Sequence, residues 1–303
     1  MLKKIQRVIQ TPKLLPIYLL SSKFSKILPE KFVIRLKYKL IMNQTLDIEN
    51  PKSFNEKLQW LKLNDKNKGY SQLVDKYEVR EYISQAIGQE YLIPLLGVYS
   101  SYEDICFEEL PNEFVLKPNH TSGDVFICTN KQKIDHKKLK NCIKKWLRKD
   151  YYWVHREFPY KGIKPKIICE QLLKEESSED IKDYKFLCFD GEVKCSFVCS
   201  NRNASTGLNV DFYDREWNKM PFERHYPRSD MHIPKPNHYE KMIELSERLS
   251  KDFAFVRVDF YESNGRLYFG ELTFYPGSGY ESFNPYSYDL LLGGWIDLSK
   301  VNN

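Results

Sequence analysis

Residues 255–279 read FVRVDFYESNGRLYFGELTFYPGSG, and this stretch decides the fold. Large apolar residues alternate with polar ones over 255–261 and again over 267–274, a period of two that predicts two short β-strands. Ser-Asn-Gly between them is a turn sequence, so the two strands are expected to form a hairpin.

The polar residues of this hairpin fall on defined faces. Residues two apart in a strand share a face, which sets Arg257 beside Asp259 and Glu271 beside Thr273. If the hairpin pairs these faces, the carboxylates suit Mg²⁺ and Arg257 faces an anion. The alternative is an ordinary hairpin with one exposed charged face. The loop at 276–279, PGSG, favours a ligand site, because glycine lets the backbone approach a ligand closely.

A second informative stretch, 114–123, reads FVLKPNHTSG. It predicts a strand that delivers Lys117 into a loop containing His120, Ser122 and Gly123. A lysine before a loop of small residues with free backbone N–H groups can cradle phosphate, although the P-loop pattern is absent. The alternative is a surface turn with one solvated lysine.

Two more predicted strands carry single charges. Residues 166–173, KIICEQLL, form an apolar run interrupted by Glu170, and a buried carboxylate requires a partner or a ligand. Residues 183–193, DYKFLCFDGEV, predict a strand with Lys185 followed by an Asp-Gly hairpin turn.

The rest of the chain predicts helices and one further strand. Ser53 and Glu56 form a capping box that begins a helix running to about residue 63. Further helices are expected over 71–87 and 135–148, with a short strand at 91–93.

Charge is unevenly distributed along the 303 residues. Residues 1–40 hold ten Lys or Arg and one acidic residue, whereas the other 263 hold 37 basic and 40 acidic residues. The longest apolar run of the basic segment, 14–20, is far too short to span a bilayer. Amphipathic helices at a membrane face or an anionic polymer would explain the segment, and so would a solvated helical extension. The seven cysteines lack zinc spacing and are expected to be reduced thiols.

Taken together, these stretches resemble the TupA-like branch of the ATP-grasp superfamily, which is encoded with bacterial surface-polysaccharide machinery. The resemblance covers residues 54–289 and rests on seven motifs in order: SFNEKLQWLK, DKYEVREYI, FVLKPNHTSG, IICEQLL, DYKF, VRVDFY and YFGELTFYPGSG. It implies an α+β fold in which the nucleotide lies between two α+β subdomains with antiparallel sheets. The implied units are a basic helical extension (1–50), an N-terminal subdomain (51–110), a small lysine-loop subdomain (111–173) and a catalytic subdomain (174–303).

The resemblance also implies a role for each matching residue in binding ATP. Lys117 and Lys185 match lysines that contact the phosphates, and Lys76 is a further candidate for such a contact. The loop holding His120, Ser122 and Gly123 resembles the flap over the phosphates. Glu170 matches the glutamate near the adenine amino group, where the backbone of Leu172 and Leu173 would meet the base.

Asp259 and Glu271 resemble the carboxylates that bridge Mg²⁺, and Arg257 resembles the arginine that steadies developing negative charge. Two acidic groups this close are expected to repel each other when no metal is bound. Thr273 stands where the family pattern has a metal-binding Asn, which leaves the second metal site open. Glu175, Glu176 and Glu179 are the alternatives for the residue that binds ribose.

The implied activity is an ATP- and Mg²⁺-dependent carboxylate–amine ligase acting through an acyl phosphate. Its substrates would be small-molecule or glycan carboxylates and amines in the making of a surface or capsular polysaccharide. We expect a cytoplasmic protein, held at the inner membrane face if residues 1–40 bind there, and no nucleic-acid partner. The alternatives are a glycosyltransferase that uses a nucleotide sugar and a noncatalytic binding protein.

Overall fold

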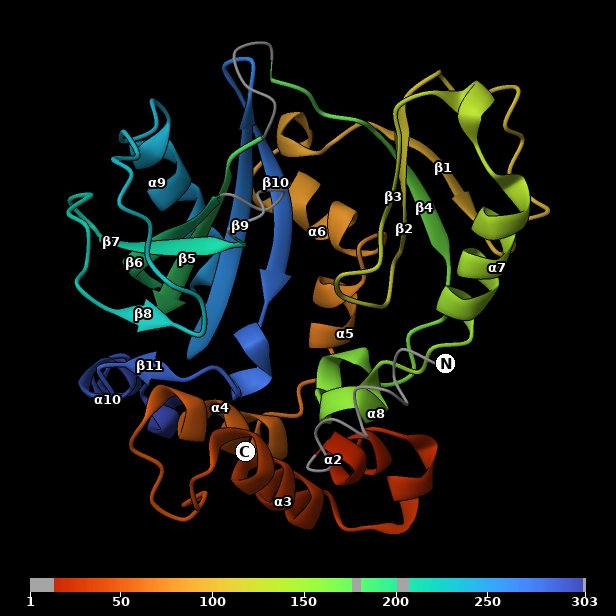
Figure 1. Ribbon diagram of the computed structural model, residues 1–303. Helices are drawn as coiled ribbons and strands as arrows, with labels where there is room; N and C mark the ends of the chain where they lie inside the picture. Colours follow the sequence, from red (N-terminus) through yellow and green to blue (C-terminus); the bar gives the residue numbers. More distant parts are fainter. Residues whose placement is uncertain (1–13, 176–180, 201–206, 302–303) are drawn as a thin grey trace.

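The computed structural model describes residues 14–175, 181–200 and 207–301. Two antiparallel sheets stand on opposite sides of the molecule, and helices α5 (Tyr70–Val74) and α6 (Val79–Ala86) lie between them (Figure 1). Helices from the N-terminal part cover one end of this arrangement. The α+β class with antiparallel sheets, expected from the sequence, is confirmed.

The larger sheet has five strands in the order β10-β9-β5-β6-β7. Their bounds are β5 (Asp183–Phe189), β6 (Glu192–Ser200), β7 (Asn209–Asp214), β9 (Phe255–Ser263) and β10 (Arg266–Thr273). Helix α9 (Tyr239–Ser250) packs against β5, β6 and β9. Aromatic and branched side chains of these strands form the largest hydrophobic core of the described residues, which makes the sheet a rigid base.

The β9–β10 hairpin is confirmed, with one irregularity. Thr273 lies opposite Arg257, but the register shifts between Phe269 and Leu272. A Cβ added at Gly270, inside the shift, would lie 3.1 Å from the Asp259 carbonyl oxygen and 3.2 Å from its Cβ. The close approach of the two strands beside Asp259 therefore favours glycine, because a side chain there would be tightly crowded.

The smaller sheet has the order β1-β4-β2-β3. Its strands are β1 (Leu95–Tyr99), β2 (Phe114–Pro118), β3 (Phe126–Cys128) and β4 (Ile167–Gln171). Helix α7 (His136–Leu147) packs on β2 and shares its separate apolar core. Strands β2 and β4 run antiparallel, with Val115 opposite Glu170, so Lys117 and Glu170 are carried on adjacent strands.

The N-terminal helices pack onto the end of the larger unit. They are α2 (Leu14–Leu20), the 3₁₀ helix η1 (Lys23–Ile27), α3 (Glu30–Met42) and α4 (Phe54–Asn64). The predicted capping box of α4 is confirmed, since the Glu56 amide donates to Ser53 Oγ at 3.2 Å and the Ser53 amide donates to Glu56 Oε2 at 3.0 Å. Helix α4 contacts α10 (Ser287–Gly294) and η5 (Pro276–Gly279).

Two expected elements differ in the structure. The single helix predicted over 71–87 is interrupted at Asp75, whose extended backbone ends α5 and whose carboxylate accepts from the amides of Tyr77 and Glu78. The interruption lets the Lys76 amide reach the Asn119 carbonyl at 3.0 Å. The strand predicted at 91–93 is wrong: a 3₁₀ helix ends at Tyr91, and strand β1 begins only after Pro94.

Short elements complete the chain: η2 (Gln89–Tyr91), η3 (Lys131–Lys133), α8 (Tyr152–His155), η4 (Phe158–Tyr160), β8 (Glu223–Arg224), β11 (Phe283–Asn284) and η6 (Leu298–Lys300). Strands β8 and β11 pair with each other. In the ranges described, no helix has the length and apolar character needed to cross a membrane.

Candidate functional site

A cleft of about 430 Å³ lies between the two sheets and is lined by residues of both. Ten of the thirteen residues singled out from the sequence line it: Lys76, Lys117, Ser122, Gly123, Glu170, Leu172, Leu173, Lys185, Asp259 and Glu271. These residues come from segments up to 195 positions apart and meet because β4 ends, and β5 begins, at the cleft. The three others, Arg257, Thr273 and His120, are not among the residues that line it.

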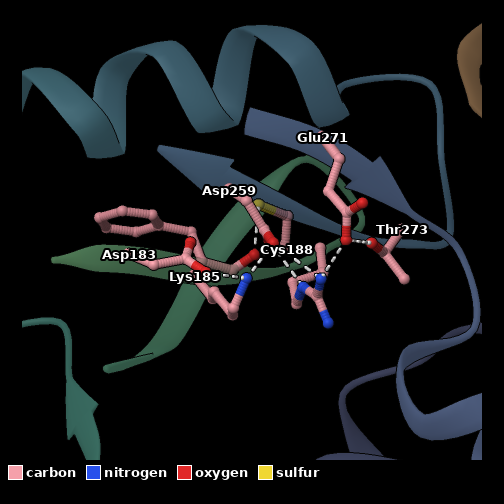
Figure 2. A network of polar contacts seen from close by, with 8 residues as sticks. Asp183, Lys185, Cys188, Asp259, Glu271 and Thr273 are labelled. Carbon is pink, nitrogen blue, oxygen red and sulfur yellow. Dashed lines mark hydrogen bonds and ion pairs between the residues drawn. The ribbon is translucent and has the colours of Figure 1, made fainter. Parts of the chain in front are cut away.

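One guanidinium joins the carboxylates of the hairpin (Figure 2). Arg257 Nε donates to Asp259 Oδ1 at 2.6 Å, and Nη2 donates to Asp259 Oδ2 and Glu271 Oε1, each at 2.7 Å. The Thr273 hydroxyl donates to the same Glu271 oxygen at 2.9 Å. The side chains expected to converge therefore do so, and the repulsion expected between the two carboxylates is offset by Arg257.

Lys185 lies between two aspartates. Its Nζ is 2.7 Å from Asp183 Oδ2 and also forms an ion pair with Asp259 (Figure 2). Burial by itself would lower the pKa of Lys185, but Asp259 and Asp183 raise it. The lysine is held charged at the cleft wall, where it can attract an anion.

The smaller sheet supplies a second lysine with its own carboxylate. Lys117 Nζ lies 2.6 Å from Glu170 Oε2, and Arg80 Nη1 lies 3.4 Å from Glu170 Oε1. Arg80 also donates to the Ile93 carbonyl at 2.9 Å. Glu170 is 5% exposed, so these two cations are the partners that its burial demanded.

Lys76 ties the loop at 119–123 to the site. Its Nζ donates to the Thr121 carbonyl, and burial lowers its pKa. His120 in the same loop bonds through Nε2 with the Lys149 carbonyl at 3.0 Å and through Nδ1 with Asn119 Oδ1 at 3.1 Å. Ser122 and Gly123, by contrast, line the cleft. The loop therefore presents its Ser-Gly part to a ligand and anchors itself through His120.

The charge balance favours an ionised Glu271, whereas burial raises the pKa of Asp259 despite the positive charges of Arg257 and Lys185. Burial would raise the pKa of Glu271, but Arg257, Lys76 and Lys185 lower it to about 2. Burial likewise opposes protonation of Arg257, and the negative Asp259 and Glu271 outweigh it and raise the pKa of that guanidinium. The centre therefore combines negative oxygens and fixed positive groups within one network.

These oxygens fit Mg²⁺, which is often bound by one or two carboxylates together with waters and substrate phosphates. Asp259 and Glu271 would hold the ion, because their carboxylates lie close enough together to share one cationic partner, Arg257. In the ranges described, no cluster of three or more His, Cys, Asp or Glu side chains suits a metal ion. The remaining ligands would therefore be waters and substrate phosphates. Thr273 contacts the carboxylate of Glu271 through its hydroxyl group.

Sequence reasoning missed Asp183, Arg80 and the tyrosines of the 151–160 segment. Asp183 shares a strand face with Lys185 two residues later, a spacing that could have identified it. Arg80 is brought to Glu170 only by the tertiary fold. Tyr151 bonds with Ser122, and the Tyr151 and Tyr160 rings meet edge to face at 4.7 Å. Negative charge on Glu157 and Glu271 adds to burial in raising the pKa of Tyr160, which places that ring near the centre.

Among the ribose candidates, Glu175 accepts from the Asn264 amide at 2.9 Å, in the β9–β10 turn. Glu176 and Glu179 lie outside the described residues.

Several solved ligases are similar to this chain at low identity. D-alanine–D-alanine ligase from Bacillus anthracis, complexed with ATP, is 15% identical over 66% of this chain and 54% of its own, with a TM-score of 0.40. The corresponding Helicobacter pylori enzyme is 14% identical over 83% and 69%, with a TM-score of 0.41. The ATP-grasp ligase PsnB, with a precursor variant, Mg and ADP, is 11% identical over 82% and 66%, with a TM-score of 0.42.

The chain thus spans little more than half the length of the first of these ligases. No curated protein sequence matches it. A family model described as TupA-like ATPgrasp matches residues 56–297, which include both sheets and all thirteen residues proposed for the site. The match confirms the resemblance drawn from the sequence motifs, and the chain belongs to the TupA-like ATP-grasp family.

Proposed function

We propose that the protein is an ATP-dependent carboxylate–amine ligase that uses Mg²⁺. One observation carries the proposal: two lysines on different sheets, Lys117 and Lys185, meet across one cleft with the carboxylates of Asp259 and Glu271. An ATP-grasp protein needs this combination, because the lysines bind phosphate oxygens while the carboxylates hold the metal.

The reaction that these groups support has two steps. A carboxylate oxygen of the substrate attacks the γ-phosphorus of ATP, the bond to the β-γ bridging oxygen breaks, and ADP leaves with an acyl phosphate formed. An amine then attacks the acyl carbon, loses a proton, and expels inorganic phosphate to give an amide. Mg²⁺, when bound, supplies charge neutralisation at the phosphates.

The protein's part is to offset repulsion between the two anions. At about 4 Å each pair of unit charges repels by ~1 kcal/mol in water and ~4 kcal/mol at an effective dielectric of about 20. Lys117 and Lys185 would bind the phosphates, and Arg257 would face the charge that develops during transfer. Leu172 and Leu173 would meet the adenine at the opposite end, with Glu170 near its amino group.

Both lysines must exchange partners for this to happen. Lys117 is paired with Glu170, and Lys185 with Asp183 and Asp259. Phosphate oxygens would take over these cations, while Mg²⁺ would take over the carboxylate oxygens of Asp259 and Glu271.

Release of ADP tests the proposal against the glycosyltransferase alternative. Purified protein is incubated with Mg²⁺ and either ATP plus mixed amino acids, sugar acids and amines, or a set of nucleotide sugars. The proposal predicts ADP release from ATP that increases with one acid–amine mixture. Turnover of a nucleotide sugar without ADP release from ATP would contradict it.

We infer a glycan or a glycan precursor as the carboxylate or amine substrate, because the chain resembles a family that is encoded with surface-polysaccharide machinery.

We also propose that the N-terminal helices dock on the inner membrane face, where such polymers are assembled. Leu15, Leu19, Ile27 and Phe32, carried on α2, η1 and α3, are between 51% and 90% exposed within a basic segment, and exposed apolar residues beside basic ones are typical of segments that bind at a membrane interface. Co-sedimentation with phosphatidylglycerol vesicles but not with phosphatidylcholine vesicles is expected, and equal recovery with both would contradict docking on an anionic surface.

A further inference from the structure

Helix α4 carries three polar side chains with no solvent exposure: Asn55, Gln59 and Lys62. Their spacing of four and three residues places them on one face of the helix. The same helix buries Phe54, Leu58 and Leu61 in the core. Burying an amide or an ammonium group is unfavourable unless it is hydrogen-bonded, so each of the three needs a partner.

All three donate to backbone carbonyls of one short segment, residues 278–281. We call residues 276–281 the glycine loop. Lys62 Nζ donates to the Ser278 carbonyl at 2.7 Å. Gln59 Nε2 donates to the Gly279 carbonyl at 2.8 Å and to that of Ser278 at 3.0 Å. Asn55 Nδ2 donates to the Glu281 carbonyl at 2.9 Å. The helix therefore binds this loop along its backbone, carbonyl by carbonyl.

The loop has a conformation that needs such support. Gly277, Ser278 and Gly279 have φ values of 58°, 55° and 63°, so a serine lies in the left-handed region between two glycines. The Ser278 hydroxyl donates to Glu157 Oε1 at 2.5 Å, a contact from the other side. A Cβ at Gly279 would lie 2.4 Å from Gln59 Nε2 and 3.0 Å from Leu58 Cβ. Helix α4 and the loop thus fit each other only with glycine there.

The strand register leads from the cleft to the glycine loop, whose residues follow the cleft lining and are not part of it. The Ser263 hydroxyl of β9 donates to the Lys174 carbonyl, next to Leu173, and from there Tyr261 and Asp259 line the cleft and Arg257 follows in the direction away from the leucines. Thr273 lies opposite Arg257, and the chain enters the loop three residues later. If adenine lies at the leucine end, as in the proposed function, the loop lies beyond the phosphates, where the attacking carboxylate must be held.

We propose that Asn55, Gln59 and Lys62 are positioning residues for the proposed ligase reaction, holding the glycine loop at the end of the cleft where the acid substrate is bound. This inference rests on the proposed function. It gives helix α4 a part in phosphoryl transfer, and it predicts different effects on two steps, the binding of Mg·ATP and the transfer of phosphate to the acid. Loss of the contacts should impair transfer to the acid and leave Mg·ATP binding intact.

Two variants and two matched controls test the inference. Lys62→Met removes the donor to the Ser278 carbonyl while keeping an apolar side chain. Gly279→Ala changes the loop instead of the helix, because the added Cβ would push the loop away from Gln59 and Leu58 of α4. Lys57→Met is the control on the same helix, because Lys57 donates to the Ile296 carbonyl at 2.7 Å, outside the loop. Gly265→Ala is the control for backbone strain, with φ of +72° and no atom within 4 Å of an added Cβ.

Three measurements are made on each protein: affinity for Mg·ATP, ADP release with the mixture of amino acids, sugar acids and amines, and hydrogen exchange of peptides covering 274–285. Lys62→Met and Gly279→Ala should bind Mg·ATP within about threefold of the wild type and release ADP at least about tenfold more slowly, with faster exchange in the loop. Both controls should match the wild type in all three.

The inference is overturned if either variant shows loop exchange and ADP release at the control level, or if Mg·ATP affinity falls as much as ADP release. Faster loop exchange with unchanged ADP release would leave the contacts a structural role only, which also overturns it. Failure of the proposed function is distinct: the wild type itself would then bind no Mg·ATP or release no ADP.

Discussion

The charged side chains of the cleft neutralise one another. Arg257 bridges Asp259 and Glu271, Lys185 bridges Asp183 and Asp259, and a separate pair joins Lys117 to Glu170. A ligand with matching charges would have to replace these ion-pair partners, taking the lysines for its own anionic groups. The cost falls on single substitutions, because removing one partner leaves the other charge buried without compensation.

Lys117→Met is expected to weaken Mg·ATP binding by about tenfold to a hundredfold, since a charge-assisted hydrogen bond contributes about 1.5–3 kcal/mol. Titration calorimetry measures the effect. Lys174→Met is the control, because Lys174 pairs with Glu113 at the surface, outside the cleft lining. Equal affinities in the two variants would remove Lys117 from the phosphate site.

Asp259→Asn is expected to lower the melting temperature of the ligand-free protein. Relief of repulsion between crowded carboxylates, considered alone, would predict no change or a rise. The structure reverses this expectation, because Asp259 is 1% exposed and compensates both Arg257 and Lys185. Differential scanning calorimetry without nucleotide distinguishes the two, and a higher melting temperature would show that the ion pairs do not stabilise the empty site.

At the scale of elements, helix α4 begins at a capping box that the sequence specifies completely. Ser53→Ala is expected to lower the free energy of unfolding by about 1 kcal/mol, since the Glu56 amide loses its acceptor. Ser53→Thr, which keeps a hydroxyl, should recover most of the loss. Urea denaturation of the three proteins measures this, and an unchanged midpoint for Ser53→Ala would show that the cap adds no stability.

Helix α3 carries a buried lysine, Lys37, and protonation of its side chain destabilises the folded protein. Lys37 Nζ donates to Ser21 Oγ at 2.9 Å and lies 3.2 Å from His155 Nδ1. Burial, aided by the charge of Lys62, lowers the pKa of Lys37 from 10.5 to about 7. Between these values the unfolded chain binds the proton and the folded protein does not, so this group adds stability as pH rises from 7.

The free energy of unfolding of the wild type, relative to Lys37→Met, is therefore expected to increase from pH 7 to pH 9.5 by about 1 kcal/mol or more, because each pKa unit corresponds to ~1.4 kcal/mol. Urea denaturation at pH 7, 8 and 9.5 gives the difference. A constant difference across these pH values would show that Lys37 titrates normally.

The sequence predicted the elements that carry their own pattern. Alternation in β9 and β10, the turn at Asn264, and the Ser53–Glu56 cap depend on neighbours within a few residues. The break at Asp75 and the start of β1 after Pro94 were missed. The break follows from the Asp75 carboxylate accepting local amides and from the hydrogen bond between the Lys76 amide and the Asn119 carbonyl, which is 43 residues away along the chain.

Within the site, residues on strands were easier to find than residues brought there by the fold. Asp259 and Glu271 could be paired by strand period, whereas Arg80 reaches Glu170 across 90 residues. The polar face of α4 was hidden for a different reason. Asn55, Gln59 and Lys62 look like surface residues in a sequence, and only the packed loop shows why all three are fully buried.

For the molecule as a whole, the two sheets together supply the residues that line the cleft. One phosphate-binding candidate, Lys117, comes from the smaller sheet, whereas Lys185 and the metal-binding candidates come from the larger one, so neither sheet holds a complete site. A ligand that bridges the sheets would stabilise the fold by a free energy that grows with the logarithm of its concentration divided by its Kd. Mg·ATP is the ligand that we propose for this cleft, with Asp259 and Glu271 as the proposed metal ligands.

The most direct test is the Mg²⁺ dependence of ATP binding in Asp259→Asn and Glu271→Gln, measured by titration calorimetry with Mg²⁺ or with EDTA. Glu262→Gln is the control on the same strand, since Glu262 pairs with His238. The wild type and the control should bind ATP at least about tenfold more tightly with Mg²⁺, and the two variants less than about threefold more tightly. A Mg²⁺ effect of wild-type size in both variants would contradict the assignment of Asp259 and Glu271 as metal ligands.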